Sequence, residues 1–165
     1  NASPAADMAP PLLALDAEVE LTSREGSRQV PLKDFFVHVR RTVRQPHELI
    51  TAIRIPLPPK GSRARFFKVA LRKADAIAVI NGAIRVDFAE DGRCQAARIA
   101  LGAVAPTPIR AYEAERALEG QVLTPEVIAG AARLAADATR PIDDLRGSAA
   151  YRRVVTEVMV RRALE

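Results

Sequence analysis

The chain has 165 residues, enough for one domain or two small ones, and its single cysteine, Cys94, excludes an internal disulfide. A lone cysteine fits a reducing compartment, so we expect a cytoplasmic protein. The formal net charge is +5, but the arginines are scattered and carboxylates stand among them, so we expect no nucleic-acid binding. No apolar run approaches the roughly 18 residues that a membrane span needs, so we expect no membrane insertion.

The N-terminal third is predicted to combine a short helix with two strands. Ser3 followed by Pro4 is typical of a helix start, Asp7 would lie in its first turn, and Pro10-Pro11 should end the helix. Apolar residues alternate with carboxylates over residues 15–21, which predicts a half-buried strand. After it we expect a turn at residues 25–27, a short helical piece at 31–36 and a strand at 49–55.

Residues 57–63, Leu-Pro-Pro-Lys-Gly-Ser-Arg, form the best internal linker. We therefore expect a domain boundary there, with residues 1–56 in one domain and residues 62–165 in the next. Beyond the linker, strands are predicted at residues 64–72, 79–88 and 94–104, and Asp91-Gly92 should form the hairpin turn between the last two.

The last third of the chain is predicted to be helical. Helices are expected over residues 109–118 and 124–138, and the second begins with Thr124-Pro125. Ser148 should cap a third helix, whose apolar stripe would be Tyr151, Val154, Val155 and Val158. Strands followed by helices indicate an α+β fold, in which a three-stranded antiparallel sheet packs against a helical cluster.

Strand alternation singles out a candidate ligand contact. In residues 64–72, Lys68 and Arg72 share a face with Phe66, because the opposite face is apolar, with Phe67, Val69 and Leu71. Two aligned cations beside an aromatic ring would suit an anionic or electron-rich ligand. The alternative is a solvated strand face.

Other residues give weaker signals. Ile50 lies opposite the other apolar residues of its strand, so it either packs on a ligand or belongs to a second buried layer. Neither His38 nor His47 has a partner motif, and both are expected on the surface. Cys94 is interpreted as a packing residue, and the adjacent Asp143 and Asp144 as residues of a turn or helix start.

Six segments in register carry a family resemblance: NASPAADMAPPLLALDAEVEL, VPLKDFF, ELITAIRIPLP, FFKVALRKADAIAVINGAIRV, RIALGAVAPTPIRA and DDLRGSAAYRR. Together they resemble the FAD-binding subunit of molybdenum hydroxylases, the xanthine dehydrogenase, aldehyde oxidase and carbon monoxide dehydrogenase enzymes. The resemblance covers essentially the whole chain and implies the latter part of the flavin-binding domain followed by the C-terminal domain. The family's upstream glycine-rich phosphate loops are not in the sequence, so we expect a segment of a longer subunit, inactive by itself.

The resemblance implies FAD as the cofactor and assigns four residues to it: Asn1, Asp7, Ile50 and Lys68. One departure is His38, which stands where many members have a glycine. The implied partners are the N-terminal part of the same subunit, an iron–sulfur subunit and a subunit that carries the molybdenum cofactor. Electrons would pass from the iron–sulfur clusters through FAD to NAD+ or another acceptor. The alternative is a non-catalytic module that docks the subunits of the same complex.

Overall fold

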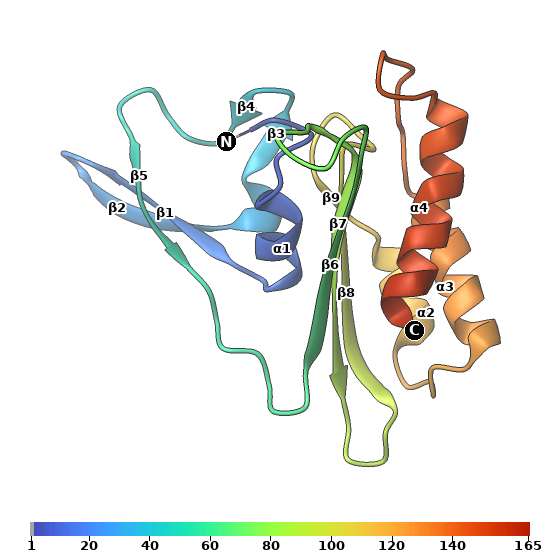
Figure 1. Cartoon of the computed structure of the whole chain (residues 1–165). Helices are drawn as coiled ribbons and strands as arrows, with labels where there is room; N and C mark the ends of the chain where they lie inside the picture. The colour runs from blue at the N-terminus through green and yellow to red at the C-terminus, as the bar shows by residue number, and fades with distance from the viewer. Residues whose placement is uncertain (1) are drawn as a thin grey trace.

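Antiparallel sheets and four α-helices make up residues 2–165, the part of the chain that this computed structural model describes (Figure 1). This mixture confirms the predicted α+β class. A small sheet has the order β2-β1-β5, with β1 at Glu18–Ser23, β2 at Gly26–Pro31 and β5 at Leu49–Arg54. The sequence pattern missed β2, because only Val30 of that polar strand is buried. Between β2 and β5 lie η1 (Leu32–Asp34), β3 (Phe36–His38) and β4 (Arg41–Thr42).

The main sheet has four strands in the order β6-β7-β8-β9, all antiparallel. They span Arg63–Ala70, Ala78–Phe88, Cys94–Gly102 and Ile109–Arg110. The first three match the prediction, and β9 is a short edge strand that it lacked. Residues 109 and 110 were expected to begin a helix, but they pair with Leu101 and Ala100 of β8 instead.

Three helices cover one face of the main sheet: α2 (Tyr112–Leu118), α3 (Pro125–Asp137) and α4 (Ala149–Leu164). The predicted caps are confirmed, since the hydroxyls of Thr124 and Ser148 accept hydrogen bonds from the backbone N–H of Val127 and Tyr151. The predicted packing role of Cys94 is also confirmed, because its side chain is fully buried and this burial raises the pKa of its thiol to about 11. None of the described helices is long and apolar enough to cross a membrane.

The predicted apolar stripe of α4 is only partly right: Val155 packs against the larger core and Val158 is half-buried. Tyr151 and Val154 are exposed, and the buried positions are Arg152, Thr156 and Val160. The reason is a buried guanidinium: Arg152 donates to the carbonyls of Val79 and Ala103 and pairs with Asp144. Asp143 accepts a hydrogen bond from the first residue of α4, which confirms the predicted helix-start role of the aspartate pair.

The helix α1 (Ala9–Ala14) covers the opposite face of the main sheet. The prediction that this helix starts at Ser3 is wrong, because it begins at Ala9. Pro10 and Pro11 lie inside its first turn, where the missing N–H of proline costs nothing, so these prolines begin the helix rather than end it. Asp7 consequently precedes the helix. The apolar side of α1 packs with Ala83 and Ala100 of the main sheet.

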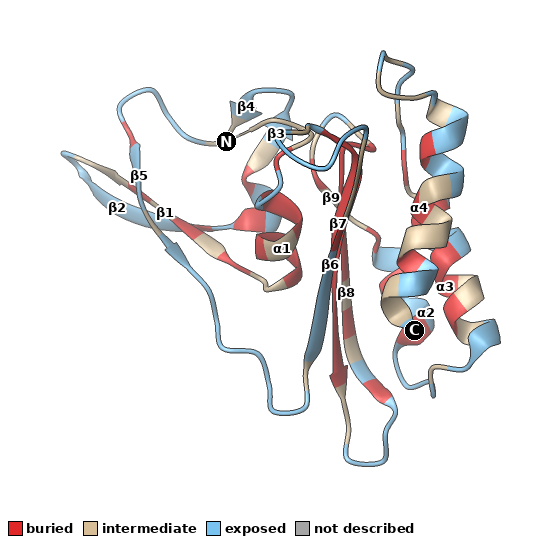
Figure 2. Cartoon of the chain, in the orientation of Figure 1, coloured by how far each residue is buried: buried red, intermediate tan, exposed pale blue. Residues whose placement is uncertain are grey.

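Because helices lie on both faces of the main sheet, β7 is buried along nearly its whole length (Figure 2). The side toward α2–α4 carries the apolar residues of the larger core, such as Ile80 and Ile84. The side toward α1 carries polar ones: Asn81, Arg85 and Asp87 are all buried. Of these, Asn81 contacts Asp7 in the segment before α1, and Arg85 contacts Asp16 after it.

Candidate functional site

Two of the predicted site residues meet where the segment before α1 crosses the main sheet. Asp7 and Lys68 are joined by an ion pair with 2.6 Å between Oδ2 and Nζ, although 61 residues separate them. Both side chains reach solvent, since 49% of Asp7 and 26% of Lys68 are exposed. A ligand at the surface could therefore approach both groups.

Strand alternation placed Lys68 correctly. Phe67 is buried in the core under α2–α4 and Val69 packs against it, whereas Phe66 is exposed and Lys68 reaches Asp7 on the α1 side. This confirms that Lys68 lies on the face away from the larger core.

The expected partnership of Lys68 with Arg72 is wrong. A bulge interrupts the pairing after Val69, and β6 ends at Ala70, so Arg72 lies in the following loop. Its guanidinium donates to the carbonyls of Ala74 and Asp75 and so braces the loop.

A hollow of about 470 Å³ lies beside Lys68, along the loop between β6 and β7. Its lining includes three cations, Lys68, Arg72 and Lys73, and one carboxylate, Asp75. The ammonium of Lys68 has three N–H donors, and the described residues take one of them, through Asp7. The residues present therefore suit an anionic or electron-rich group, which is the chemistry that a flavin ring edge offers.

The main sheet holds the segment that carries Asp7. The N–H of Ala103 donates to the carbonyl of Pro4 at 2.7 Å. The amide Nδ2 of Asn81 donates to Oδ1 of Asp7 at 3.0 Å and to the carbonyl of Ala6 at 3.3 Å. Residues 4–7 are therefore fixed to the end of β7 and β8 before α1 begins.

The remaining predicted residues lie elsewhere. Ile50 is on β5 in the small sheet, which Figure 1 shows apart from β6, and 44% of it is exposed, so it is not part of a second buried layer. Asn1 lies outside the described residues. His38 on β3 and His47 are both exposed, as predicted.

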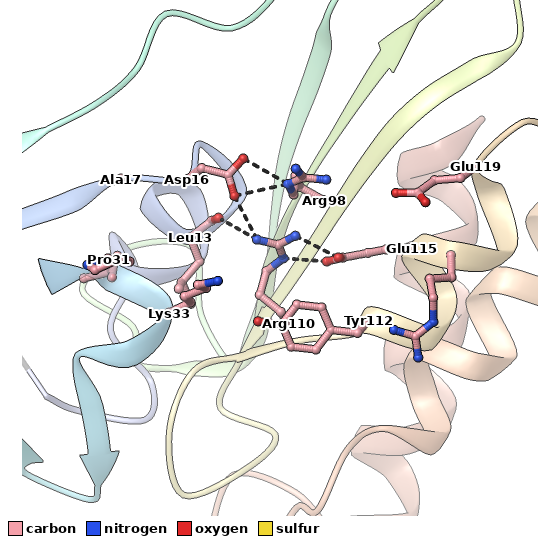
Figure 3. A pocket seen from close by; sticks show the side chains of 12 residues that line it. Leu13, Asp16, Ala17, Pro31, Lys33, Arg98, Arg110, Tyr112, Glu115 and Glu119 are labelled. Atoms are coloured by element: carbon pink, nitrogen blue, oxygen red, sulfur yellow. Dashed lines mark hydrogen bonds and ion pairs between the residues drawn. The ribbon is translucent and has the colours of Figure 1, made fainter.

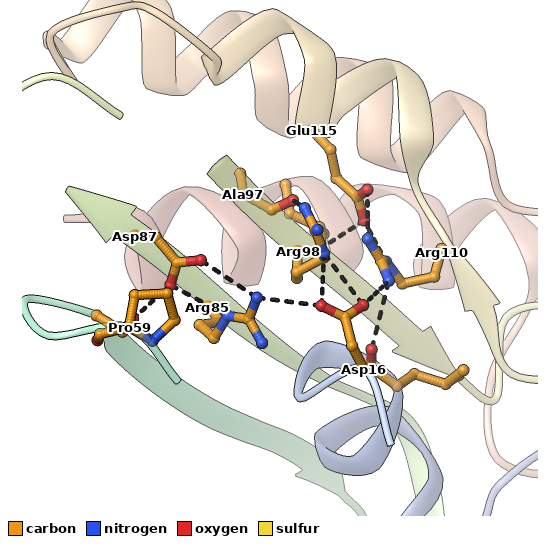
Figure 4. Close-up of polar contacts among 11 residues, drawn as sticks. Asp16, Pro59, Arg85, Asp87, Ala97, Arg98, Arg110 and Glu115 are labelled. Atoms are coloured by element: carbon orange, nitrogen blue, oxygen red, sulfur yellow. Dashed lines mark hydrogen bonds and ion pairs between the residues drawn. The ribbon is translucent and has the colours of Figure 1, made fainter. Parts of the chain in front are cut away.

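A second carboxylate, Asp16, follows α1 and collects three arginines (Figure 4). Arg85 of β7, Arg98 of β8 and Arg110 of β9 approach its carboxylate at 3.1, 2.9 and 3.0 Å. Burial works against ionisation of Asp16, but the hydrogen bond from Arg98 and the charges of the three arginines outweigh it and lower the pKa of the carboxyl. Asp16 therefore stays charged and fastens the end of α1 to three strands.

A hollow of about 390 Å³ lies next to this cluster (Figure 3). Most of its charged lining residues are already paired: Arg110 binds Asp16 and also Glu115, with Nε and Nη2 at 2.5 and 2.7 Å from the two Oε atoms. Arg116 pairs with Glu113. Few charges are left for a ligand, so this hollow is the weaker candidate site.

Sequence comparisons identify the family. The profile of the CO dehydrogenase flavoprotein C-terminal domain matches residues 65–165, and that of the FAD binding domain in molybdopterin dehydrogenase matches residues 1–58. The chain belongs to the flavoprotein subunits of the molybdenum hydroxylases. It is 39% identical to the carbon monoxide dehydrogenase medium chain of Afipia carboxidovorans, over all of this chain and 57% of that protein.

Further relatives agree with this family. Over 99% of its length the chain is 38% identical to the alpha subunit of the 6-hydroxypseudooxynicotine dehydrogenase complex of Paenarthrobacter nicotinovorans, and it covers 55% of that protein. The crystal structure of the cyanide-inactivated Cu,Mo-CO dehydrogenase superimposes with a TM-score of 0.93 at 38% identity, covering 99% of this chain and 57% of that one. The chain thus spans little more than half the length of the relatives it matches. The cofactor of the family's flavoprotein subunits is FAD.

Sequence reasoning missed two residues of this region, Asn81 and Asp16. Asn81 had a detectable signal, because it stands alone as an amide within the otherwise apolar run Ala-Val-Ile-Asn-Gly-Ala-Ile. Asp16 had none: it looked like one of three alternating carboxylates, and only the folded chain gathers the arginines around it. Within residues 2–165, no group of three or more His, Cys, Asp or Glu could hold a metal ion.

Proposed function

We propose that this chain forms part of the FAD-carrying subunit of a molybdenum hydroxylase and that Asp7 and Lys68 belong to the flavin site, together with Asn1 and Ile50. The bound FAD would supply the redox step, between the iron–sulfur clusters of one partner subunit and NAD+ or another acceptor. Substrate oxidation itself belongs to a second partner, which carries the molybdenum cofactor. A cytoplasmic location fits this role.

One observation carries the proposal. The family resemblance picked Asp7 and Lys68 independently of any contact, and the fold joins them in an ion pair of 2.6 Å that is open to solvent. A pair that served only stability would be expected to contribute little at such an exposed position, about 0 to 1 kcal/mol. The hollow beside Lys68, which Arg72 and Lys73 also line, offers space for a ligand next to the pair.

The chain's own groups would then bind and tune the flavin. The ammonium of Lys68 can donate a hydrogen bond to a ring-edge acceptor, and its positive charge favours electron uptake by the ring. A unit charge 4 Å away is worth about 4 kcal/mol at an effective dielectric constant of 20. Asp7 offsets part of that charge and holds Lys68 in place.

The alternative, a non-catalytic docking module, is the weaker proposal. A docking module has no need for cations around a hollow at the end of β6. We also propose that the domain boundary lies in residues 57–61, between a first domain of residues 1–56 and a second of residues 62–165; these five residues are exposed. Across this boundary α1 packs on the main sheet, so the two parts remain in contact.

The test is Lys68→Met in the complete subunit produced with its partners. We expect lower FAD content and a lower flavin midpoint potential, because a stabilising positive charge is lost, with little change in melting temperature. Lys33→Met is the control, since Lys33 is an exposed cation on η1, away from β6. Unchanged FAD content and potential in Lys68→Met would contradict the proposed site.

A further inference from the structure

A row of three residues crosses the main sheet beneath the segment that carries Asp7. Lys68 of β6 is directly opposite Asn81 of β7, and Asn81 is directly opposite Gly102 of β8. Because directly opposed residues of antiparallel strands point to the same face, all three lie on the α1 side. Asp7 receives hydrogen bonds from the first two members of this row.

The orientation of the Asn81 amide is determined by its neighbours. Its Nδ2 faces two acceptors, the Asp7 carboxylate and the Ala6 carbonyl, so the nitrogen must point toward them. The amide oxygen is then turned away, fully buried, and finds no hydrogen-bond partner among the described residues. An unpaired buried oxygen costs stability, so this amide is poorly explained by stability alone.

The absence of a side chain at Gly102 makes this orientation possible. A Cβ at Gly102 would overlap the Asn81 amide oxygen, and it would also lie 3.1 Å from Cγ of Pro10. The backbone of Gly102 has no left-handed conformation, so glycine is needed here for space. The sheet therefore leaves room on β8 for an amide on β7 that reaches the segment above it.

We propose that Asn81 is a positioning residue of the flavin site. Its amide holds one oxygen of Asp7, so that only the other oxygen is left to Lys68, and the ammonium remains partly available to the cofactor. This inference rests on the proposed function, in which Asp7 and Lys68 contact FAD. Without the amide, Asp7 is free to pair more fully with Lys68, and the effective positive charge at the flavin falls.

The experiment compares Asn81→Ala, Gly102→Ala and the double variant in the complete subunit with its partners. For Asn81→Ala we expect roughly tenfold weaker FAD binding, the factor that corresponds to about 1.4 kcal/mol, and a flavin potential shifted downward by less than in Lys68→Met. Gly102→Ala should shift both quantities in the same direction, because its new methyl group displaces the amide. In the Asn81→Ala background the same substitution should add much less, since the overlapping oxygen is gone and only the 3.1 Å contact with Cγ of Pro10 remains.

The control is Thr139→Val, which removes a buried hydrogen bond at the end of α3, on the other side of the sheet. It should lower the melting temperature and leave the potential unchanged.

If Asn81→Ala behaves like this control, Asn81 is only structural and the inference is wrong. If Asn81→Ala does not fold, Asn81→Ser replaces it. Effects of Gly102→Ala and Asn81→Ser on the flavin potential that simply add in the double variant would then overturn the inference. A potential that responds to Lys68→Met but not to Asn81→Ala refutes the positioning role alone, whereas no response to either refutes the proposed function.

Discussion

One aspartate lies at each end of α1, and the two differ in the number and type of their ion-pair partners. Asp7, before the helix, pairs with one lysine and shares an amide, and 49% of its side chain is exposed. Asp16, after the helix, pairs with three arginines from three strands. Two of these arginines, Arg85 and Arg110, are themselves almost fully buried. The same carboxylate chemistry thus fastens the helix at one end and remains open to a ligand at the other.

The difference comes from the partners rather than from the aspartates. Arginine offers five donors in a planar fork, so three guanidinium groups can saturate the oxygens of Asp16. Lysine offers a compact charge on a flexible stem, and at Lys68 most of its donor capacity remains. We therefore expect substitutions at Asp16 to change stability and substitutions at Asp7 or Lys68 to change the flavin.

The largest expected effect is the loss of stability in Asp16→Ala. Removing the carboxylate leaves the buried charges of Arg85 and Arg110 with one partner fewer each. Because 37% of Asp16 is exposed and Asp87 and Glu115 still pair with these arginines, we expect a loss of about 1 to 3 kcal/mol, less than for a fully buried pair. Urea unfolding measures it, with Arg161→Ala at the exposed Arg161–Glu165 pair as the control, expected within about 0.5 kcal/mol. An equal effect of the two substitutions would remove the contrast between the ends of α1.

The ion pairs between Asp16 and its three arginines should also make stability depend on pH. The pKa of Asp16 is lowered in the folded protein, so its contribution is complete above the ordinary carboxyl pKa and is lost as the pH falls through the folded value. In a series from pH 7 to pH 3, the melting temperature should therefore fall once the pH is lower than about 4. In Asp16→Asn the protein should be less stable at pH 7, and the drop at acidic pH should be smaller. Parallel curves for the two proteins would show that Asp16 does not contribute to acid sensitivity.

Asp7→Asn tests the open end of the helix. Losing the negative charge leaves the charge of Lys68 without an offset, so the flavin potential of the complete subunit should rise, opposite to the fall expected for Lys68→Met. The effect on unfolding should stay within about 1 kcal/mol, because the pair is solvent-exposed. A potential that moves in the same direction in both variants would show that the two residues do not act through opposing charges.

The smallest expected effect is that of cutting the chain in the linker between β5 and β6. Limited proteolysis should first cut residues 57–61, which are exposed and lie outside any strand. We expect the two products to stay together after the cut, because α1 remains packed on the main sheet and tied to it through Asp16. Size-exclusion chromatography of the nicked protein checks this. In Asp16→Ala the products should separate more readily, and unchanged co-elution in that variant would show that apolar packing alone holds α1.

Local chemistry made several elements predictable. The capping hydroxyls of Thr124 and Ser148, the Asp91-Gly92 turn and the alternation around Phe67 depend on neighbours in the chain, so the sequence pattern was sufficient. The predicted buried stripe of α4 was wrong at Tyr151 and Val154, because the helix buries the polar side chain of Arg152 there instead. The start of α1 failed because Pro10-Pro11 has the same local signal at a helix beginning as after a helix end.

By itself, the sequence determined the α+β class, most strands and helices of the second half, and the placement of Lys68 on the face away from the larger core. Only the tertiary structure decided that Lys68 would meet Asp7, that Asn81 would orient that carboxylate, and that three arginines would converge on Asp16. The reason is physical: secondary structure follows from side chains within a few positions of one another. The charge pairs join strands and a helix that are distant in the chain, and they form only when α1 docks on the sheet.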